Sequence, residues 1–263
     1  TRRTQGDRSA DDSSSTETAA PGEAVNPEQR TTSLVPLRPQ QKGIIAVEAR
    51  SRELETSPLK GMATRQQLDS FRELRTRLVA TAAAAGLSHF TTLVVPVSSG
   101  AGASFVARNL AVAFALEERR LAILVDCNLR HPTQHAALGM RGPEVGLFDF
   151  LERPEGDVDR LIRPTPVPGL HLIPAGRPPS IPREYFSSQA MQMVMGALRQ
   201  PSCYVFLDSP PAKGAPDARI LSDLADFVIL VVGYAMEAPE TIAKTAAMFD
   251  PAKFVGVVFN ERS

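Results

Sequence analysis

The stretch "VVPVSSGAGASFVARNLA", residues Val94–Ala111, decides the fold predicted for this chain. An apolar run ends in a short loop of small residues, and a helix is expected to begin at Ser104. Glycines and a following helix N-terminus let backbone N–H groups turn toward phosphate, so this pattern is typical of a phosphate-binding loop. Ala103 stands where such a loop carries its phosphate-gripping lysine. A lone Gly-Ala-Gly also fits an ordinary strand-to-helix turn.

Strands and helices are expected to alternate on both sides of this loop. Apolar runs predict strands over 91–97, 121–126, 170–175, 204–208, 226–233 and 254–260, and helical spacing predicts helices over 63–85, 104–120, 187–200, 217–225 and 239–249. Nearly continuous apolar strands are typical of parallel strands covered by helices on both faces. We therefore expect an α/β fold with a doubly wound, mainly parallel sheet, and a ligand site at the carboxyl ends of its strands.

Composition limits the number of domains and the classes of partner. Of the 263 residues, those from 1 to 60 are rich in Ser, Thr, Pro, Glu, Gln and Arg, which predicts a disordered tail before one domain over 61–263. Lys and Arg number 29 and Asp and Glu also 29, so no net charge attracts nucleic acid or acidic lipid. Cys127 and Cys203 lack metal spacing and are expected to be buried reduced thiols. We found no membrane span or signal peptide, so a cytoplasmic location is expected.

Two acids stand at equivalent places after strands, beside the glycine loop. Asp126 ends "LAILVD" and Asp208 ends "YVFLD". A carboxylate at the end of a buried strand is costly unless it meets a cation or hydrogen-bond donors. Such an acid can hold Mg²⁺ directly or through water in a nucleotide site. Each of the two also fits a capped loop acid.

The order of these segments resembles the catalytic domain of the bacterial tyrosine autokinases (BY-kinases) of capsule and exopolysaccharide assembly. These kinases are related to the deviant Walker P-loop ATPases. Their PGEGKS loop corresponds to "SGAGAS", their D-x-D-x-R-x-P motif to "DCNLRHP", their IIDTPP to "FLDSPP" and their GVVLN strand to "GVVFN". The downstream Asp-Ala of the family matches "PDA", which contains Asp217. The resemblance covers roughly residues 62–261.

The resemblance implies roles for particular residues. Gly100, Gly102, Ala103, Ser104 and Asn260 would contact ATP or ADP. The metal ligands for Mg²⁺ would be Ser104, Asp126 and Asp208. The segment "DSFRELR" is similar to the E-x-x-R-x-x-R helix through which subunits join into a ring, so Asp69, Arg72 and Arg75 are the expected oligomerisation residues. Without the resemblance these charges fit a solvated helix face.

This chain departs from the family at groups that carry catalysis. Ala103 replaces the lysine that bridges the β- and γ-phosphates, Ser98 stands where deviant P-loops carry their second lysine, and Asn128 replaces the second acid of the D-x-D motif. Removal of one preorganised electrostatic stabiliser costs about a hundred- to a thousandfold in rate. Arg108 is four residues along the helix from Ser104, about one turn away, so Lys213 is the better candidate for a substitute cation.

The resemblance also implies a place for the phosphate acceptor, and no tyrosine tail is expected there. BY-kinases modify a tyrosine cluster beyond the last strand, whereas the printed sequence ends in "FNERS". Its tyrosines are Tyr185, Tyr204 and Tyr234. No catalytic residue is therefore assigned, and Asp126 and Asp208 remain candidates together with the lysine of "PPAKGAP".

Three hypotheses about function follow. The first is a pseudokinase that binds nucleotide with Mg²⁺ weakly, or not at all, and regulates a membrane polysaccharide co-polymerase as a homo-oligomer at the inner membrane, held there only through that partner. The alternative is an active but unusual ATPase or tyrosine kinase of the same pathway that uses Lys213 or a partner's residue. A second alternative is a partition- or positioning-type relative. Nothing in the sequence resembles a base-stacking surface, so nucleic acid is not an expected partner.

Overall fold

The computed structural model describes residues 65–117, 120–142, 145–177, 184–201, 203–214 and 216–261. The tail predicted over residues 1–60 lies outside these described residues. Within them, no helix is both long enough and apolar enough to span a membrane.

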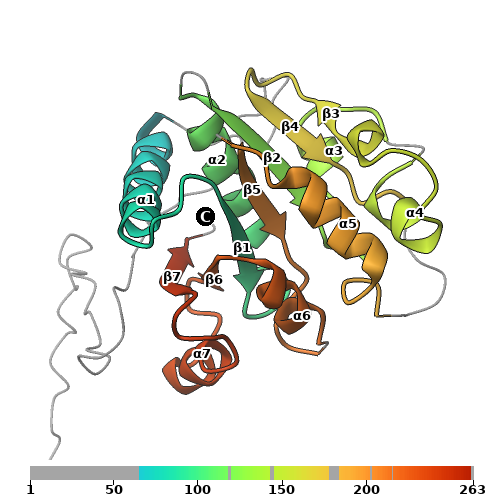
Figure 1. The fold of residues 1–263 in the computed structure, drawn as a ribbon. Helices are drawn as coiled ribbons and strands as arrows, with labels where there is room; N and C mark the ends of the chain where they lie inside the picture. Colours follow the sequence, from blue (N-terminus) through green and yellow to red (C-terminus); the bar gives the residue numbers. More distant parts are fainter. Residues whose placement is uncertain are drawn as a thin grey trace, which may run out of the picture. The chain divides into compact units, whose positions relative to one another are not determined.

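The described residues form seven strands with helices between them (Figure 1). The strands are β1 (Phe90–Pro96), β2 (Leu121–Asp126), β3 (Arg163–Pro164), β4 (Leu170–Ile173), β5 (Cys203–Asp208), β6 (Phe227–Gly233) and β7 (Phe254–Asn260). The α-helices are α1 (Arg65–Ala84), α2 (Ala103–Ala115), α3 (Gln134–Ala137), α4 (Leu147–Glu152), α5 (Gln189–Leu198), α6 (Asp217–Leu224) and α7 (Pro239–Ala246), and a 3₁₀ helix η2 covers Val158–Leu161.

One sheet contains all seven strands, in the order β3-β4-β2-β5-β1-β6-β7. All neighbours are parallel except β3 and β4, which are antiparallel. The predicted doubly wound, mainly parallel α/β fold is confirmed. Because β1 lies between β5 and β6, the loop after β1 emerges at the centre of the sheet, where open α/β sheets bind ligands.

Differences from the predicted elements are local. Four elements that the sequence did not predict lie between β2 and β4 in the chain: α3, α4, η2 and β3. Each has six residues or fewer. Segments this short carry too few residues to show a hydrophobic period. Helix α2 ends at Ala115 rather than at residue 120, because the "EERR" that follows Leu116 offers no apolar side chain to bury.

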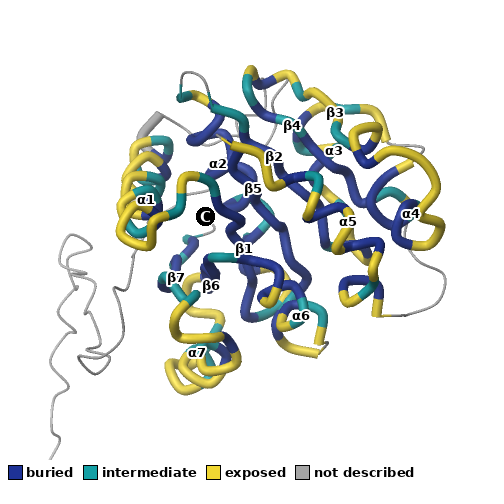
Figure 2. Tube along the Cα trace, in the orientation of Figure 1, coloured by how far each residue is buried: buried dark blue, intermediate teal, exposed yellow. Residues whose placement is uncertain are grey.

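Successive residues of a buried strand point to opposite faces of the sheet, which creates two hydrophobic cores. Leu93 and Val95 of β1 belong to the core that α4, α5 and α6 cover, whereas Val94 belongs to the core under α1 and α2. Figure 2 shows the strands buried and the outward faces of the helices exposed. Cys127 and Cys203 are both free and buried, as expected from the sequence.

The core under α2 contains a cluster of aromatic rings around Phe114. This side chain is fully buried, and its ring centroid lies 4.7 Å from that of Tyr204, 5.1 Å from that of Phe206 and 5.8 Å from that of Phe90. The rings join the C-terminal end of α2 to β1 and β5 and so orient the helix whose N-terminus follows the glycine loop.

We predict that Phe114→Ala lowers the free energy of unfolding by about 3–5 kcal/mol, because it removes a fully buried ring and leaves a cavity. Urea denaturation measures this loss. Leu116→Ala is the matched control, since that side chain is 54% exposed and its truncation should change stability by no more than about 0.5 kcal/mol. Equal losses in the two variants would show that the aromatic cluster does not hold α2.

Candidate functional site

Sheet register brings the three predicted site segments together. Asp126 is the register partner of Asp208 across the β2–β5 ladder, and Asp208 is the partner of Val94 across the β1–β5 ladder. Both carboxylates are fully buried. The two acids therefore lie side by side at the carboxyl edge of the sheet, next to the loop that leaves β1.

The glycine loop adopts a backbone that needs glycine. Gly100 and Gly102 have φ values of 86° and 84°, in the left-handed region that side chains rarely adopt. Gly102 is the N-cap of α2 and contributes no side-chain hydrogen bond. The first N–H groups of a helix have no partner inside the helix, so the loop and α2 present backbone donors to an anion.

Asn260, at the end of β7, holds this loop in place through a hydrogen bond, a contact called the Asn260 brace below. Its Nδ2 donates to the carbonyl oxygen of Ala101 at 3.0 Å. A Cβ at Gly102 would lie 1.9 Å from that same Nδ2. The Oδ1 of Asn260 is buried and has no hydrogen-bond partner within the described residues. The predicted nucleotide residue Asn260 thus lies at the loop and offers an unused acceptor.

A hydrogen-bonded chain joins Asp208 to the first turn of α2. The Ser104 hydroxyl donates to Asp208 Oδ1 at 3.1 Å. Gln134 Nε2 donates to Asp208 Oδ2 at 2.6 Å and also to the carbonyl oxygen of Ser104 at 3.0 Å. Each oxygen of the Asp208 carboxylate therefore has a donor supplied by the protein itself.

The Asp126 carboxylate accepts backbone hydrogen bonds from the loop after β2. The N–H of Asn128 donates to Oδ1 at 3.2 Å, and those of Thr133 and Gln134 donate to Oδ2, each at 3.1 Å. Asp126 thus shapes its own loop and caps the start of α3. These contacts agree with the interpretation of Asp126 as a capped loop acid, whereas its role as an Mg²⁺ ligand stays a prediction.

Arg108 lies closer to the acids than the sequence suggested. Its side chain is only 5% exposed, and Nη1 donates to Gln134 Oε1 at 3.1 Å and to the carbonyl oxygen of Ser104 at 3.5 Å. Helical side chains point back toward the N-terminus, so a residue four positions along covers the preceding turn. That rule, together with the apolar residues around Arg108 in the sequence, could have indicated that its side chain reaches the site. No feature of the sequence indicates that Gln134 belongs to the site.

Burial and charge determine how the site titrates. Burial, and then the neighbouring Asp208 charge, raise the pKa of Asp126 well above its ordinary value, although three backbone N–H groups oppose this. Burial also raises the pKa of Asp208, against the hydrogen bonds from Gln134 and Ser104 and the charge of Arg108. Burial lowers the pKa of Arg108 to about 10, which leaves it a cation at neutral pH.

Lys213 lies beside the start of the loop but is already paired. Its Nζ is 2.7 Å from Glu237 Oε2, its side chain is 49% exposed, and its backbone N–H donates to the Val97 carbonyl oxygen. Hydrogen bonds from Lys213 and Ser98 lower the pKa of Glu237. Ser98 occupies the predicted station of the second lysine, so Glu237 and Lys213 form a neutral pair at this station.

Ala103 leaves the loop itself without a cation. Its side chain is 3% exposed and belongs to the core under α1 and α2. Neither of the nearby cations replaces it at the first residue of α2, since Arg108 faces Gln134 and Lys213 faces Glu237. Among the described residues, the loop itself therefore offers an anion its backbone N–H groups and no side-chain cation.

The site fits Mg²⁺ in its oxygen ligands but not in its charge. Ser104, Asp126 and Asp208 lie together, and carboxylate and hydroxyl oxygens are ligands that Mg²⁺ accepts. Arg108 already offsets part of the negative charge of the acids, and Gln134 hydrogen-bonds Asp208 from within the protein. A divalent cation here would meet a buried guanidinium.

The predicted oligomerisation residues lie on α1 in different surroundings. Asp69 and Arg72 pair with each other at 3.0 Å and are exposed. Arg75 instead donates to the Ala113 carbonyl oxygen at 2.8 Å and lies 2.8 Å from Glu117, which joins α1 to the C-terminal end of α2. Subunit contact remains a prediction, and Arg75 has a contact inside its own chain.

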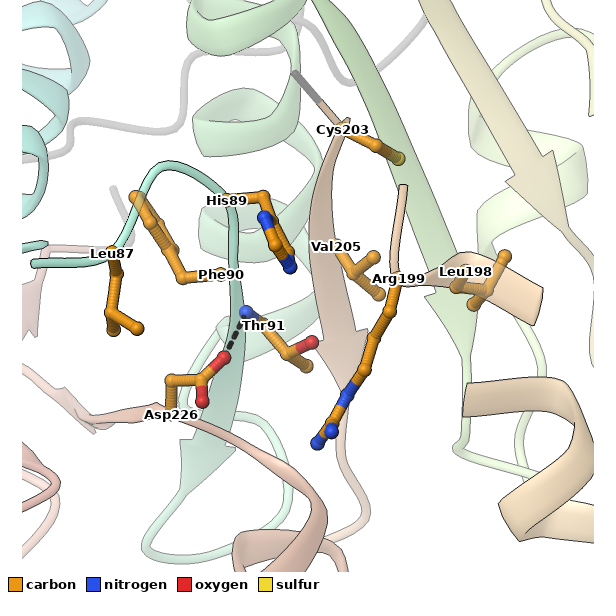
Figure 3. A pocket seen from close by; sticks show the side chains of 9 residues that line it. All are labelled: Leu87, His89, Phe90, Thr91, Leu198, Arg199, Cys203, Val205 and Asp226. Atoms are coloured by element: carbon orange, nitrogen blue, oxygen red, sulfur yellow. Dashed lines mark hydrogen bonds between the residues drawn. The ribbon is translucent and has the colours of Figure 1, made fainter. Parts of the chain in front are cut away.

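A separate cavity of about 150 Å³ lies at the opposite, amino edge of the sheet. Figure 3 shows His89, Arg199 and Asp226 around it, with Asp226 accepting a hydrogen bond from the Thr91 N–H at 2.8 Å. Thr91 is near the start of β1 and the glycine loop follows its end. This cavity is therefore no part of the phosphate-binding site.

Comparison with known proteins shows similarity to bacterial tyrosine kinases. The tyrosine-protein kinase Wzc of Salmonella typhi is 27% identical over 202 residues, which are 76% of this chain and 27% of that protein. The tyrosine-protein kinase YwqD of Bacillus subtilis (strain 168) is 28% identical over 172 residues, 65% of this chain and 71% of that protein. This chain thus spans about a quarter of Wzc but most of YwqD. No protein-family model matches it.

Solved structures show the same fold. The BceF tyrosine kinase domain superposes with a TM-score of 0.67 and 24% sequence identity, covering 84% of this chain and 93% of that one. At this identity the likeness shows the fold alone.

We predict that Gly102→Ala destabilises the domain more than Gly86→Ala does. Both glycines have positive φ, but a Cβ at Gly86 meets nothing within 4 Å, whereas one at Gly102 meets Asn260. The φ penalty alone is about 1 kcal/mol, and the clash at Gly102 should bring the loss in unfolding free energy to about 2–3 kcal/mol. Adding Asn260→Ala should recover part of the difference in a double-mutant cycle. Equal losses for the two glycines would contradict the brace.

We also predict that stability falls as pH rises between about pH 5 and pH 8 in the presence of EDTA. Folding raises the pKa of both acids, so the folded domain retains a proton that the unfolded chain has released. Asp208→Asn should flatten this dependence, because the amide does not ionise and its loss of charge lowers the pKa of Asp126. Urea denaturation across this pH range measures the slope.

The matched control is Asp223→Asn, which changes an exposed acid of α6 outside the site. Its slope should equal that of the unaltered protein. Parallel slopes for all three proteins would show that the buried acids do not control the pH dependence.

Proposed function

The folded domain is a P-loop domain of the bacterial tyrosine kinase (BY-kinase) type, and we propose that it acts by binding rather than by phosphoryl transfer. The observation that carries this proposal is Ala103 at the first residue of α2. Phosphoryl transfer depends on electrostatic stabilisation of charge on the transferred group, which a P-loop lysine supplies. Here no side-chain cation stands at that position.

Other features of the site support the same proposal. Asn128 contributes its backbone N–H to Asp126, and its side chain brings no charge to the site. Among the tyrosines, Tyr185 and Tyr204 are buried, whereas Tyr234 is 62% exposed. Neither buried tyrosine can meet the site of another copy while the domain is folded, which leaves Tyr234 as the accessible one.

The intact parts of the loop support phosphate binding. The glycines hold the left-handed backbone, the N-terminus of α2 faces the loop, and Asn260 braces it. Such a cradle holds an anion through N–H groups and the helix dipole, without a lysine. We therefore propose weak binding of ATP or ADP at Gly100, Gly102, Ala103 and Ser104, with Asn260 next to the ligand.

The similarity to bacterial tyrosine kinases supports a proposal for the biological role. We propose that the domain serves capsule or exopolysaccharide assembly, at the cytoplasmic face of the inner membrane, by docking on a membrane polysaccharide co-polymerase. A bound partner shifts a conformational equilibrium by preferring one state, and this needs no hydrolysis. The exposed Asp69–Arg72 pair on α1 is the proposed contact in a homo-oligomer.

An active enzyme is the second candidate, and Lys213 supports it. This lysine lies beside the loop, half exposed, and its partner Glu237 is on a separate segment after β6. Release of the ion pair would free the cation for a phosphate. A partition- or positioning-type protein is a third candidate, since it would use the same sheet and loop, but the missing lysines argue against nucleotide-driven switching.

We predict that the protein hydrolyses ATP no faster than buffer, and that Ala103→Lys tightens ATP binding by about tenfold or more. The longer side chain would have to extend from the buried Cβ position of residue 103 to the N-terminal end of α2, where its ammonium would meet the phosphates, and about 1.4 kcal/mol of added attraction gives a tenfold change. Calorimetric titration measures affinity, and phosphate release measures turnover.

Leu116→Lys is the matched control, because it adds the same charge at the exposed far end of α2, about 20 Å away. It should leave ATP affinity unchanged. Turnover by the unaltered protein that Lys213→Ala abolishes would refute the binding role and establish the enzymatic one.

A further inference from the structure

We propose that Arg108, acting through Gln134, replaces the divalent cation at this site, so that the loop binds phosphate esters in their metal-free form. This proposal deepens the binding role above and rests on it for the identity of the ligand. The question is whether the site binds the nucleotide with Mg²⁺ or without it, and the loop residues alone do not determine this.

The hydrogen bonds place Gln134 where a metal-bound water would act. In P-loop sites the acid after this strand holds Mg²⁺ directly or through water. Here Gln134 Nε2 donates to Asp208 Oδ2 at 2.6 Å, as the O–H of such a water would. The amide oxygen at its other end accepts from Arg108 Nη1 at 3.1 Å. The amide therefore links the carboxylate to a fixed positive charge.

Charge favours Arg108 over a metal. Asp126, Gln134 and Asp208 are fully buried and Arg108 is 5% exposed, so water screens these groups poorly. The guanidinium is a cation and attracts both acids. A divalent cation would add two positive charges beside Arg108 and would have to displace the Gln134 amide.

The same cation lies near the phosphate cradle. Arg108 Nη1 is 3.5 Å from the carbonyl oxygen of Ser104, in the first turn of α2. A positive charge behind a helix N-terminus adds to the attraction that the helix dipole exerts on an anion. A phosphate at the loop thus meets favourable charge without bringing a metal ion.

The first experiment measures metal binding without nucleotide. Thermal unfolding is recorded in EDTA and in millimolar MgCl₂, and Mn²⁺ binding is followed by electron paramagnetic resonance. The unaltered protein should show the same melting temperature in both buffers and no bound Mn²⁺. Arg108→Met should gain Mg²⁺-dependent stabilisation, because it exposes the acid pair to a metal. Arg108→Lys is the matched control, which keeps the charge and should stay indifferent to Mg²⁺.

The second experiment compares ADP affinity in EDTA and in MgCl₂ by calorimetry. The affinities should agree within about twofold for the unaltered protein. Bound Mn²⁺, stabilisation by MgCl₂ alone or ADP binding that requires Mg²⁺ would each overturn the proposal. If Arg108→Met does not fold, the Mn²⁺ spectrum of the unaltered protein decides. ATP turnover is a separate measurement, which tests the proposed binding role and not the metal-free form of the ligand.

Discussion

The site depends on one constraint, the parallel register that sets Asp126 beside Asp208 at the buried end of two strands. Two fully buried carboxylates at adjacent positions repel each other and have lost their hydration, so the protein must supply protons, hydrogen bonds or a cation. The loop after β2 supplies three N–H groups to Asp126, and Ser104 with Gln134 supplies the donors for Asp208. The arrangement of the surrounding loops follows from this requirement.

The substitutions in this chain fall on groups that would carry charge to a nucleotide. Ala103 and Ser98 stand at the positions predicted for lysines, whereas Gly100, Gly102 and Asn260 keep the backbone shape of the loop. The left-handed glycines and the hydrogen bond from Asn260 hold the loop backbone without a lysine. The shape of the loop therefore does not depend on a lysine side chain.

Arg108 places a buried cation near the two acids. The first residue of α2 carries no cation, whereas Arg108, about one turn further along, is buried and donates to Gln134. There its charge attracts the two carboxylates instead of contacting a phosphate. Lys213, the cation that the sequence favoured as a substitute, is engaged by Glu237 near Ser98.

The sequence by itself determined the doubly wound sheet, the position of the glycine loop and the two strand-end acids, because these depend on apolar periodicity and on local loop chemistry. Short elements such as α3 and η2 could not be predicted from the sequence, since four residues are too few to show a hydrophobic period. Only the tertiary structure decided that Gln134, 26 positions from Arg108, joins that guanidinium to Asp208. Such a contact between distant segments depends on how they pack, and no local pattern records it.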